Sequence, residues 1–534
     1  MDHSKNYDIV FVGQDYQPLS KAVERAAFYC DGIEQVIHFD GTVVPKSEAD
    51  SKSDPEMLRR ILDVFLEEVA PNGICRQDLF VINSSGSSRG KRKLFDPNFS
   101  VKEEQGYFGG LVGVIKKDIK VPMGSFLTDA DQEETEIHVT LQIKSRLDVD
   151  ENGNVGKPFF LSTMLLKNKL EFNDNMVPNS EDEIFDYLLL FWFKEQLQRA
   201  CLKGYYKTYR RFEKNDDRVK GTIDVARHIR LNAGQKNGKI AYSYRENTID
   251  NYLNQLIVAA YKHLKNKYYE LVTNNFDNIP DLKKSVDFLS NEIGFSGIKK
   301  SYLINKNTKI IAHPYFTEYE ELRQTCLKIL RDEAISIFDG NAEQETQGML
   351  FYLPDLWETF LEDEVIGKEL PKDVTYRAQF FVRNFGYLQK DGQYDYRQES
   401  YPDYVFFMEK MPFMILDAKC KPKWEGVFEG SSVSEVMEDY NKCIRDMVAI
   451  DSHATGVMFP TNRADEVNET VLKHPISEYN KHDFFYTIPI QVPHVKANET
   501  YSEWLEKFTE NLEKGRNITG TIIQKEKTRR TSTN

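Results

Sequence analysis

The stretch PDYVFFMEKMPFMILDAK, residues 402–419, decides how the C-terminal part of this chain folds. It holds two apolar runs, 402–408 and 412–419, which are rich in Val, Ile, Phe and Leu and have the length of β-strands. Residues 409–411 separate the two runs, and this is a common length for a hairpin connection. The stretch therefore predicts a β-hairpin that turns near Lys410.

The register of this hairpin predicts where its charged residues meet. If the chain folds back at Lys410, Asp403 falls opposite Asp417, because each lies seven positions from the turn. The apolar pairs that follow from this register are Val405 with Ile415 and Phe407 with Phe413. Because side chains alternate along a strand, Asp403, Asp417 and Lys419 share one face. We therefore expect two carboxylates and an ammonium group to converge at the open end of the hairpin.

This combination of charges is typical of a metal-dependent nuclease. Two close carboxylates repel each other unless a cation lies between them. A hard divalent ion, Mg²⁺ or Mn²⁺, takes oxygen ligands of this kind. A neighbouring lysine can position or activate water while the metal stabilises charge on a phosphoryl oxygen. The pattern predicts Asp403 and Asp417 as metal ligands and Lys419 as a catalytic residue. The alternative is a surface hairpin with ordinary charges beside its turn.

A third acid is expected from a segment upstream of the hairpin. LPDLWETFLEDEVI, residues 353–366, has the spacing of an amphipathic helix, and Glu358 follows Trp357 on it. A helix packed beside the hairpin would bring Glu358 to the metal as a catalytic residue, in the role of an auxiliary ligand or orienter. The alternative is a solvated glutamate, since the same helix carries three more acids at 362–364.

Together these segments resemble the McrC-like nuclease subunit of McrBC-type restriction systems, which act on 5-methylcytosine or related DNA and belong to the PD-(D/E)xK nuclease superfamily. The segments that carry the resemblance are LQIKSRLD (141–148), FFLSTMLL (159–166), RVKGTID (218–224), YRENTIDNYLNQLIVAAYKHL (244–264), LWETFLEDEV (356–365), Gln379, PDYVFF (402–407), ILDAK (415–419) and GVMFP (456–460). The resemblance implies a restriction-endonuclease-like α/β core and an Mg²⁺-dependent DNA endonuclease that serves antiviral defence.

The resemblance also implies a partner, a GTP-hydrolysing AAA+ ring of the McrB-like class, into which the N-terminal part of this chain would dock. Residues 86–91, GSSRGK, lack the spacing of a phosphate-binding loop, so the motor would be supplied in trans. One such site cuts one strand, so double-strand cleavage is expected to need dimerisation of complexes or two passages. The family often has a glutamine near the metal where this chain has Lys442, and whether Lys442 replaces that helper stays open.

A basic segment predicts contact with DNA. Eleven basic and four acidic residues lie between Lys203 and Lys239, with aromatic residues among them. Such a segment can hold phosphates by charge. The residues predicted to bind DNA are Lys207, Arg210, Arg211, Lys214, Arg218 and Lys220. The alternative is a solvated face whose long side chains cover core aromatics. The net charge of −14 argues against indiscriminate DNA binding.

Composition predicts a large cytoplasmic protein of several domains. The chain has 534 residues, which suggests two to four domains. No apolar run approaches the length of a membrane span, so no membrane association is expected. Six scattered cysteines without a C-x-x-C pair argue against zinc and against a disulfide framework, and they suit a reducing compartment.

The predicted fold class is multidomain α/β. The predicted parts are an N-terminal α+β partner-docking region (1–125), a connecting strand and helix (126–180), a mainly helical middle domain with the basic segment (181–345), the nuclease domain (346–514) and a disordered basic tail (515–534). Two other functions stay open. One is a non-catalytic assembly or DNA-binding adaptor that stimulates the motor, and the other is a nuclease that acts on RNA or repair intermediates.

Overall fold

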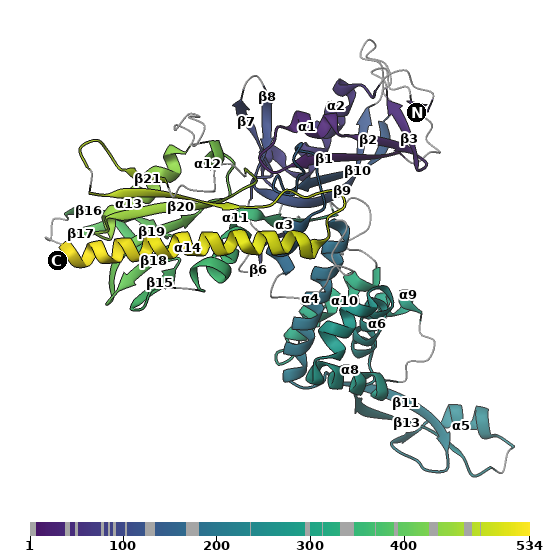
Figure 1. Cartoon of the computed structure of the whole chain (residues 1–534). Helices are drawn as coiled ribbons and strands as arrows, with labels where there is room; N and C mark the ends of the chain where they lie inside the picture. Colours follow the sequence, from purple (N-terminus) through teal and green to yellow (C-terminus); the bar gives the residue numbers. More distant parts are fainter. Residues whose placement is uncertain are drawn as a thin grey trace. The chain divides into compact units, whose positions relative to one another are not determined.

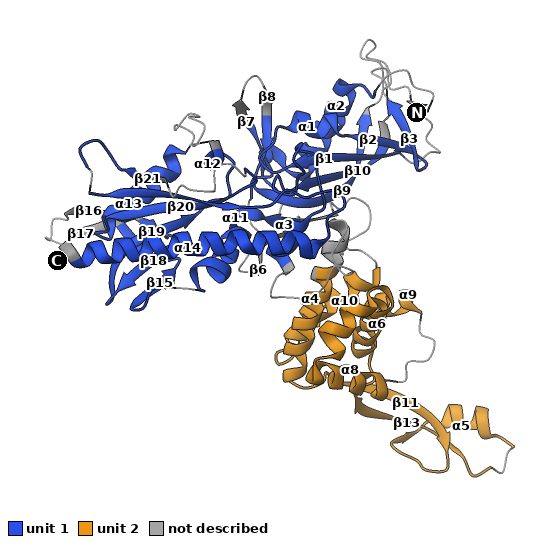
Figure 2. Cartoon of the chain, in the orientation of Figure 1, with its two compact units in different colours: residues 1–165, 177–181, 337–534 blue, residues 166–176, 182–336 orange. Residues whose placement is uncertain are grey.

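The chain forms two compact units (Figure 1). The computed structural model describes residues 7–37, 43–47, 52–75, 80–83, 86–88, 92–101, 104–122, 134–166, 181–234, 237–293, 299–311, 313–331, 347–368, 370–388, 394–426, 436–463, 472–480 and 482–533. Unit 1 comprises residues 1–165, 177–181 and 337–534, and unit 2 comprises residues 166–176 and 182–336 (Figure 2). Unit 2 is thus inserted into the sequence of unit 1. The expected mixed α/β architecture with several parts is confirmed.

The N-terminal part of unit 1 is built on a nine-stranded mixed sheet. Its strands, in spatial order, are β4 (Val43–Pro45), β3 (Ile33–Ile37), β2 (Ala27–Cys30), β1 (Tyr7–Gln14), β10 (Glu134–Lys144), β9 (Leu111–Pro122), β14 (Gln347–Tyr352), β5 (Phe80–Asn83) and β6 (Gly86–Ser88). Strand β1 runs parallel to β10, and β10 runs antiparallel to β9. Tyr7, Ile9 and Phe11 alternate with less buried residues along β1, so one face of this strand enters the core.

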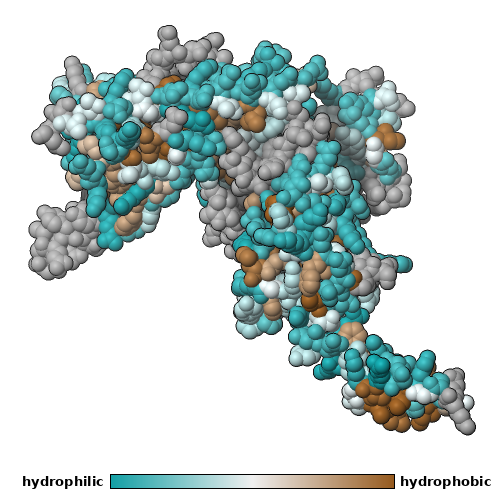
Figure 3. All heavy atoms as spheres, turned by 60° about the horizontal axis from the view of Figure 1, so that its bottom comes forward, coloured by the Kyte–Doolittle hydropathy of each residue, from teal (hydrophilic) through white to brown (hydrophobic). Residues whose placement is uncertain are grey.

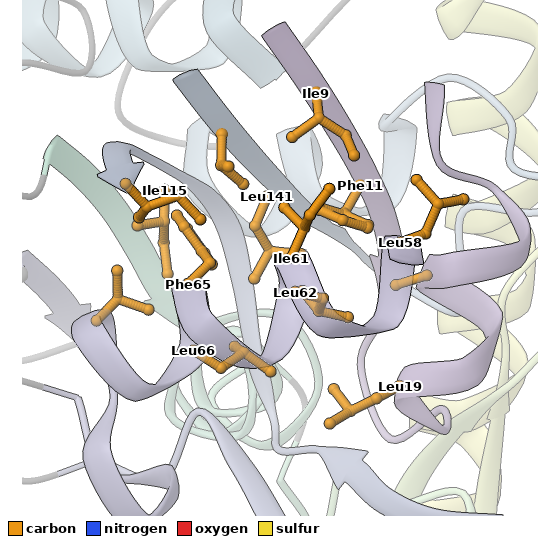
Figure 4. Packing of buried hydrophobic residues seen from close by; sticks show 14 of the residues in the cluster. Ile9, Phe11, Leu19, Leu58, Ile61, Leu62, Phe65, Leu66, Ile115 and Leu141 are labelled. Carbon is orange, nitrogen blue, oxygen red and sulfur yellow. The ribbon is translucent and has the colours of Figure 1, made fainter. Parts of the chain in front are cut away.

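Helix α2 (Pro55–Val69) contributes its apolar face to this core. Asp54 caps the helix by accepting hydrogen bonds from the backbone N–H groups of Glu56 and Met57, at 2.9 and 3.1 Å. Its apolar residues recur every three or four positions and meet side chains of the sheet (Figure 4). The residues of this core include Ile9, Phe11, Leu58, Ile61, Leu62, Phe65, Leu66, Ile115 and Leu141. The N-terminal part of unit 1 therefore has an extensive core of its own.

Strand β14 changes the domain boundary predicted at residue 346. It pairs with β9 in antiparallel and with β5 in parallel orientation, so it completes the N-terminal sheet instead of beginning the C-terminal part. Strand β10, predicted as a connecting strand, lies near the middle of the same sheet. Both differences have one cause, because strand partners that lie far apart in sequence leave no local pattern.

The C-terminal part of unit 1 is built on a six-stranded mixed sheet. Its strands, in spatial order, are β15 (Val374–Ala378), β18 (Tyr404–Met408), β19 (Met411–Ala418), β20 (Ala454–Thr461), β22 (Phe484–Gln491) and β21 (Leu472–Pro475). Strand β20 runs parallel to both of its neighbours, and all eight of its residues are buried. A continuous buried run is typical of a central parallel strand with both faces covered.

The helices of this part are α11 (Leu353–Leu361), which continues as a π-helical turn (Glu362–Ile366), α13 (Met437–Ala449) and α14 (Tyr501–Thr533). The other elements of unit 1 are α1 (Leu19–Glu24), a 3-10 turn (Pro71–Gly73), β7 (Phe95–Val101), β8 (Glu104–Phe108), α3 (Phe159–Leu166), β16 (Val382–Leu388), β17 (Tyr394–Ser400) and α12 (Lys423–Gly426).

Helix α14 contradicts the prediction of a disordered tail at 515–534, because the helix continues to Thr533. Beyond Lys514 it still buries Ile522 and Ile523. Its Arg516 guanidinium lies 3.1 Å from the buried carboxylate of Glu364, in the π-helical turn after α11. The polar composition of the tail concealed the apolar stripe and this ion pair, which hold the helix on unit 1.

Unit 2 is mainly helical and also contains a small sheet. Its elements are α4 (Glu181–Leu202), β11 (Thr208–Asp216), β12 (Thr222–Ile223), α5 (Val225–Asn232), β13 (Ile240–Thr248), α6 (Tyr252–Lys267), α7 (Tyr269–Val272), a π-helical turn (Thr273–Asp277), α8 (Pro280–Glu292), α9 (Lys300–Lys306) and α10 (Glu318–Arg331). The three strands form a sheet in the order β11-β13-β12. Within the described ranges of both units, every helix is too short or too polar to cross a membrane.

Candidate active site

The site begins with the hairpin of β18 and β19. Its turn consists of Glu409 and Lys410, both with positive φ angles of 49° and 73°, as in the tight turns that suit the twist of a hairpin. A turn of two residues displaces the pairing by one position from the predicted register. A bulge then restores that register, because Phe407 pairs with Pro412 and leaves Phe413 unpaired. The predicted pair Phe407–Phe413 is therefore wrong, whereas Val405 with Ile415 is confirmed.

Asp403 and Asp417 meet at the open end of this hairpin, where each carboxylate accepts a hydrogen bond from the backbone of the other strand. The backbone N–H of Asp403 donates to Oδ1 of Asp417 over 3.2 Å. The backbone N–H of Ala418 donates to Oδ2 of Asp403 over 2.7 Å. Both aspartates are buried, with 6% and 1% of their surface exposed. The structure thus brings the two predicted carboxylates together in a protected place.

Lys419 lies beside both carboxylates. Its Nζ hydrogen-bonds Oδ2 of Asp417 and lies 3.9 Å from Oδ2 of Asp403. Its backbone N–H donates to the carbonyl oxygen of Met458 on β20 over 2.9 Å, which continues the strand pairing past the end of β19. The sheet therefore fixes the backbone of Lys419 while its ammonium group faces the aspartates.

The surroundings shift the pKa values of the two aspartates in opposite directions. Burial and the Asp417 charge raise the pKa of Asp403 well above its ordinary value. Burial would also raise the pKa of Asp417, but the Lys419 and Lys442 ammonium groups outweigh it and lower the pKa. Burial would lower the pKa of Lys419, but Asp417 and Asp403 outweigh it and raise the pKa. Asp417 therefore carries the charge that the lysines neutralise.

Glu358 reaches the same site from α11 through an amide. The side-chain nitrogen of Gln379 hydrogen-bonds Oε1 of Glu358 and lies 3.4 Å from Oδ1 of Asp403. Burial raises the pKa of Glu358. The hydroxyl of Tyr404 donates to the backbone oxygen of Glu358 over 2.5 Å and ties the helix to the hairpin. The predicted third acid is thus present, but Gln379 stands between it and Asp403.

Sequence reasoning gave Gln379 no part in the site, although it singled the residue out as a point of resemblance. Gln379 follows β15 and has a positive φ of 47°, which is uncommon for a residue with a side chain. Its backbone N–H donates to the Asp403 carbonyl oxygen over 3.0 Å. A backbone conformation of this kind depends on the neighbouring strand and cannot be read from local sequence.

Lys442, whose role the sequence left open, also contacts Asp417. It projects from α13, and its Nζ lies 3.2 Å from Oδ2 and 3.4 Å from Oδ1 of Asp417. The neighbouring thiol of Cys443 lies 3.9 Å from the same Oδ2, and burial raises its pKa well above the ordinary value. Asp417 therefore has two ammonium groups as partners, one from its own strand and one from a helix.

The donor atoms fit a hard divalent ion. Asp403 and Asp417 offer carboxylate oxygens beside one another, which is the donor type that such ions prefer. Burial and the Asp417 charge raise the pKa of Asp403, and a cation bound between the two carboxylates would oppose both effects. Among the residues that the structure describes, however, no three His, Cys, Asp or Glu side chains already form a group able to hold a metal ion. Glu358 would join the two aspartates only if the Gln379 amide moved.

The predicted DNA-binding residues lie together on unit 2. Arg210, Arg211 and Lys214 belong to β11, Lys207 precedes it, and Arg218 and Lys220 follow it. All six are exposed. Because side chains alternate along a strand, Arg210 and Lys214 share one face and Arg211 takes the other. Arg210 pairs with Asp250 at 3.0 Å, and Arg211 lies 3.8 Å from Glu213. The basic segment is a β-ribbon with charge on both faces.

The same end of unit 2 exposes apolar side chains (Figure 3). These are Val219, Ile223, Val225, Ile229 and Leu231, from β12, from α5 and from the turn before β12. The basic ribbon thus carries an apolar patch beside its charges.

Comparison with known proteins places the chain in a family. No curated protein matches it. The similar solved structures include two from Thermococcus gammatolerans. The refined half-complex from the tetradecameric assembly of Thermococcus gammatolerans McrB AAA+ hexamers with bound McrC contains a chain with 15% identity over 79% of this chain and 85% of its own, with a TM-score of 0.36. The cryo-EM structure of the Thermococcus gammatolerans McrBC complex gives 14% identity over 51% of this chain and 69% of its own, with a TM-score of 0.23.

The chain also matches a protein family. Residues 130–432, more than half of the chain, match the family described as McrBC 5-methylcytosine restriction system component. The match includes Asp403, Asp417, Lys419 and the helix that carries Glu358. The chain therefore belongs to the family of McrBC 5-methylcytosine restriction system components.

Proposed function

We propose that this chain is the McrC-like nuclease subunit of an McrBC-type restriction system, a PD-(D/E)xK endodeoxyribonuclease that depends on Mg²⁺ or Mn²⁺. The observation that carries the proposal is the interlocked pair of Asp403 and Asp417 with the Lys419 ammonium beside it. Family membership supports the restriction system. The six-stranded sheet, with α11 and α13 beside it, would be the restriction-endonuclease-like core.

Each residue has a distinct role in this proposal. Asp403 and Asp417 would hold the ion, and Glu358 would be an auxiliary ligand. The ion, when bound, would act as a Lewis acid toward the phosphoryl oxygen and lower the pKa of bound water. Lys419 would orient the attacking water and offset the charge that develops on the phosphate. Its ammonium is paired with Asp417, so it acts as a cation that holds its proton. The oxygen of water bonds to phosphorus, one phosphorus–oxygen ester bond breaks, and the proton that the attacking water loses passes to the leaving oxygen.

The substrate and the partner follow from family membership and are part of the proposal. DNA would be the substrate, with the basic ribbon of unit 2 as one contact surface. A GTP-hydrolysing AAA+ ring of the McrB-like class would drive cleavage, and two complexes would associate to cut both strands. The N-terminal sheet of unit 1 would be the docking region for the ring.

A reconstituted cleavage reaction tests the proposal. The chain is mixed with its ring GTPase, GTP, Mg²⁺ and methylated DNA, and Asp417→Asn is compared with the parent. Assayed below its melting temperature, the folded variant should bind the ring and stimulate GTP hydrolysis as the parent does, but it should leave the DNA uncut. Cleavage by Asp417→Asn at the parental rate would contradict the site. A parent that stimulates GTP hydrolysis but cuts neither DNA nor RNA would favour the adaptor function instead, and one that cuts only RNA would favour an RNA nuclease.

A further inference from the structure

Lys442 contacts Asp417 in the candidate site, but the reaction proposed above gives it no role. It shares Asp417 with Lys419, yet the two lysines differ in their freedom. The Lys419 side chain is 12% exposed, whereas the Lys442 side chain is 32% exposed. Lys419 extends from a strand end that is hydrogen-bonded to β20. Lys442 reaches the same carboxylate from a helix with a long, flexible side chain, so its head has a path to solvent.

The fold holds the backbone of Lys442 in place. Cys443, next to it on α13, is buried in a cluster with Trp424, Val457, Phe459 and Phe485. One turn further on, Asp446 accepts a hydrogen bond from the hydroxyl of Ser400 over 2.8 Å. In the first turn of the helix, Asp439 pairs with Lys421 at 2.9 Å. The helix therefore presents Lys442 to the aspartates, and only its side chain is free to move.

The net charge of the site favours withdrawal of the Lys442 ammonium group when a divalent ion binds. Three carboxyl groups, Asp403, Asp417 and Glu358, lie together with two ammonium groups, so their formal charges sum to one negative charge once a bound ion has displaced the acidic protons. A divalent ion added beside both lysines would reverse that excess to one positive charge in a largely buried place, which is costly. If one ammonium withdraws, the loaded site is neutral. Lys442 is the lysine that can withdraw.

We propose that Lys442 has two positions in the working cycle. On Asp417 it serves as a built-in counter-ion that holds the site together before a divalent ion binds. When the ion takes its place on Asp417, Lys442 turns to the phosphate of the bound DNA and stabilises the charge there. This inference rests on the proposed nuclease function and adds to it a competition between Lys442 and the ion for one carboxylate.

The first test measures binding of Mn²⁺ to the full chain without DNA, by calorimetry. Because Lys442→Gln removes the competitor for Asp417, it should bind Mn²⁺ about fivefold tighter or more, the size of a typical coupling between two sites. Lys421→Gln is the matched control, since it removes an ammonium that pairs with the same helix but does not touch Asp417. Unchanged or weaker binding by Lys442→Gln would mean that the lysine does not compete with the ion.

The second test measures cleavage by the reconstituted complex at saturating Mn²⁺ and at several salt concentrations. Lys442→Gln should lower kcat about 100-fold, the lower end of the range for removal of one electrostatic partner of a developing charge. The slope of log affinity for DNA against log salt should fall by about 0.9, as expected when one phosphate is no longer neutralised. Lys442→Arg should restore part of both effects. A parental kcat for Lys442→Gln at saturating metal would contradict the proposed contact of Lys442 with the phosphate.

The nuclease function and the role of Lys442 fail in different ways. A parent complex that neither binds Mn²⁺ nor cuts nucleic acid would overturn the nuclease function and this inference with it. A parent that does both, with Lys442→Gln indistinguishable from it in metal affinity, kcat and salt slope, would overturn only the role of Lys442. Tighter metal binding together with slower cleavage is the result expected here, and a merely structural lysine would not produce that combination.

Discussion

Asp403 and Asp417 are coupled through the backbones of their two strands. The N–H of Asp403 donates to the Asp417 carboxylate over 3.2 Å, and the N–H that follows Asp417 donates to the Asp403 carboxylate over 2.7 Å. Neither side chain can turn away without breaking a buried hydrogen bond to the other strand. Their environments nevertheless differ, because the lysine contacts concentrate on Asp417. The two aspartates should therefore contribute differently to stability.

Asp403→Asn and Asp417→Asn should both abolish cleavage but differ in stability. Asp417→Asn removes the carboxylate that pairs with two lysines, and removal of one partner from a buried ion pair costs about 3–5 kcal/mol. Asp403→Asn should cost much less, because burial and the Asp417 charge already raise the pKa of Asp403 and oppose its ionisation. Thermal unfolding of the two variants at pH 7 measures the difference. Equal losses of stability would contradict the assignment of the charge to Asp417.

Asp148 should make stability depend on pH. Its carboxylate accepts hydrogen bonds from the backbone N–H groups of Phe160 and Leu161, at 2.6 and 3.2 Å, at the start of α3, and burial raises its pKa from 3.8 to about 7. The folded protein therefore binds this proton more tightly than the unfolded chain. The contribution of the protonated Asp148 to the free energy of unfolding is fully present below pH 3.8, and it is lost as the pH rises through about 7.

Melting temperatures at pH 5, 6, 7 and 8 measure this effect. The parent should gain stability relative to Asp148→Asn as the pH falls from 8 to 5, because asparagine cannot take up the proton. Asp150→Asn is the control, since hydrogen bonds from Asn154 lower the pKa of the exposed Asp150 and keep its titration below this range. If the difference in melting temperature between the parent and Asp148→Asn is the same at all four pH values, the prediction is wrong.

The end of α14 should be essential for the stability of unit 1. Arg516→Met removes the cation 3.1 Å from the buried Glu364 carboxylate, so we expect a loss of about 3–5 kcal/mol. Lys514→Met changes an exposed lysine of the same helix and should have little effect. The double variant Arg516→Met with Glu364→Met should regain part of the loss. A chain that ends at residue 514 and melts like the parent would restore the disordered-tail prediction.

The basic ribbon should contribute to DNA affinity through charge alone. Replacing Arg210, Arg211 and Lys214 with glutamate should weaken DNA binding and reduce the salt slope by about 0.9 for each phosphate that the ribbon no longer neutralises. The fold should persist, because all three side chains are exposed. Lys283 and Lys284, exposed on α8, provide a charge-swapped control on the same unit. A salt titration that gives parental slopes for the ribbon variant would leave these residues as an ordinary solvated surface.

The isolated chain should neither bind nor hydrolyse GTP, and it should cut DNA poorly. The reason is that its P-loop-like stretch, residues 86–91, departs from the phosphate-loop spacing. Filter binding of labelled GTP and a cleavage assay with and without the ring GTPase measure both properties. Robust cleavage by the chain alone would favour a self-sufficient nuclease.

The local features of the site follow from short stretches of the amino-acid sequence. Two apolar runs around a short polar connection predict a hairpin, and strand alternation then predicts which charges share a face. For this reason the pairing of Val405 with Ile415 and the meeting of Asp403, Asp417 and Lys419 could be foreseen. The helical spacing around Glu358 could be foreseen for the same reason, because each of these features depends on neighbours only a few residues away.

The distant elements that complete the site could not be predicted in this way, because folding of the whole chain brings them together. Lys442 reaches Asp417 from a helix that begins after β19, and Gln379 enters because its backbone bonds to Asp403. Strand β14 joins the N-terminal sheet, and α14 is held by Glu364. These outcomes depend on burial and pairing between segments far apart in the chain. The spacing of apolar residues within one segment does not reveal such partners, because the contacts that stabilise them form only when the chain folds.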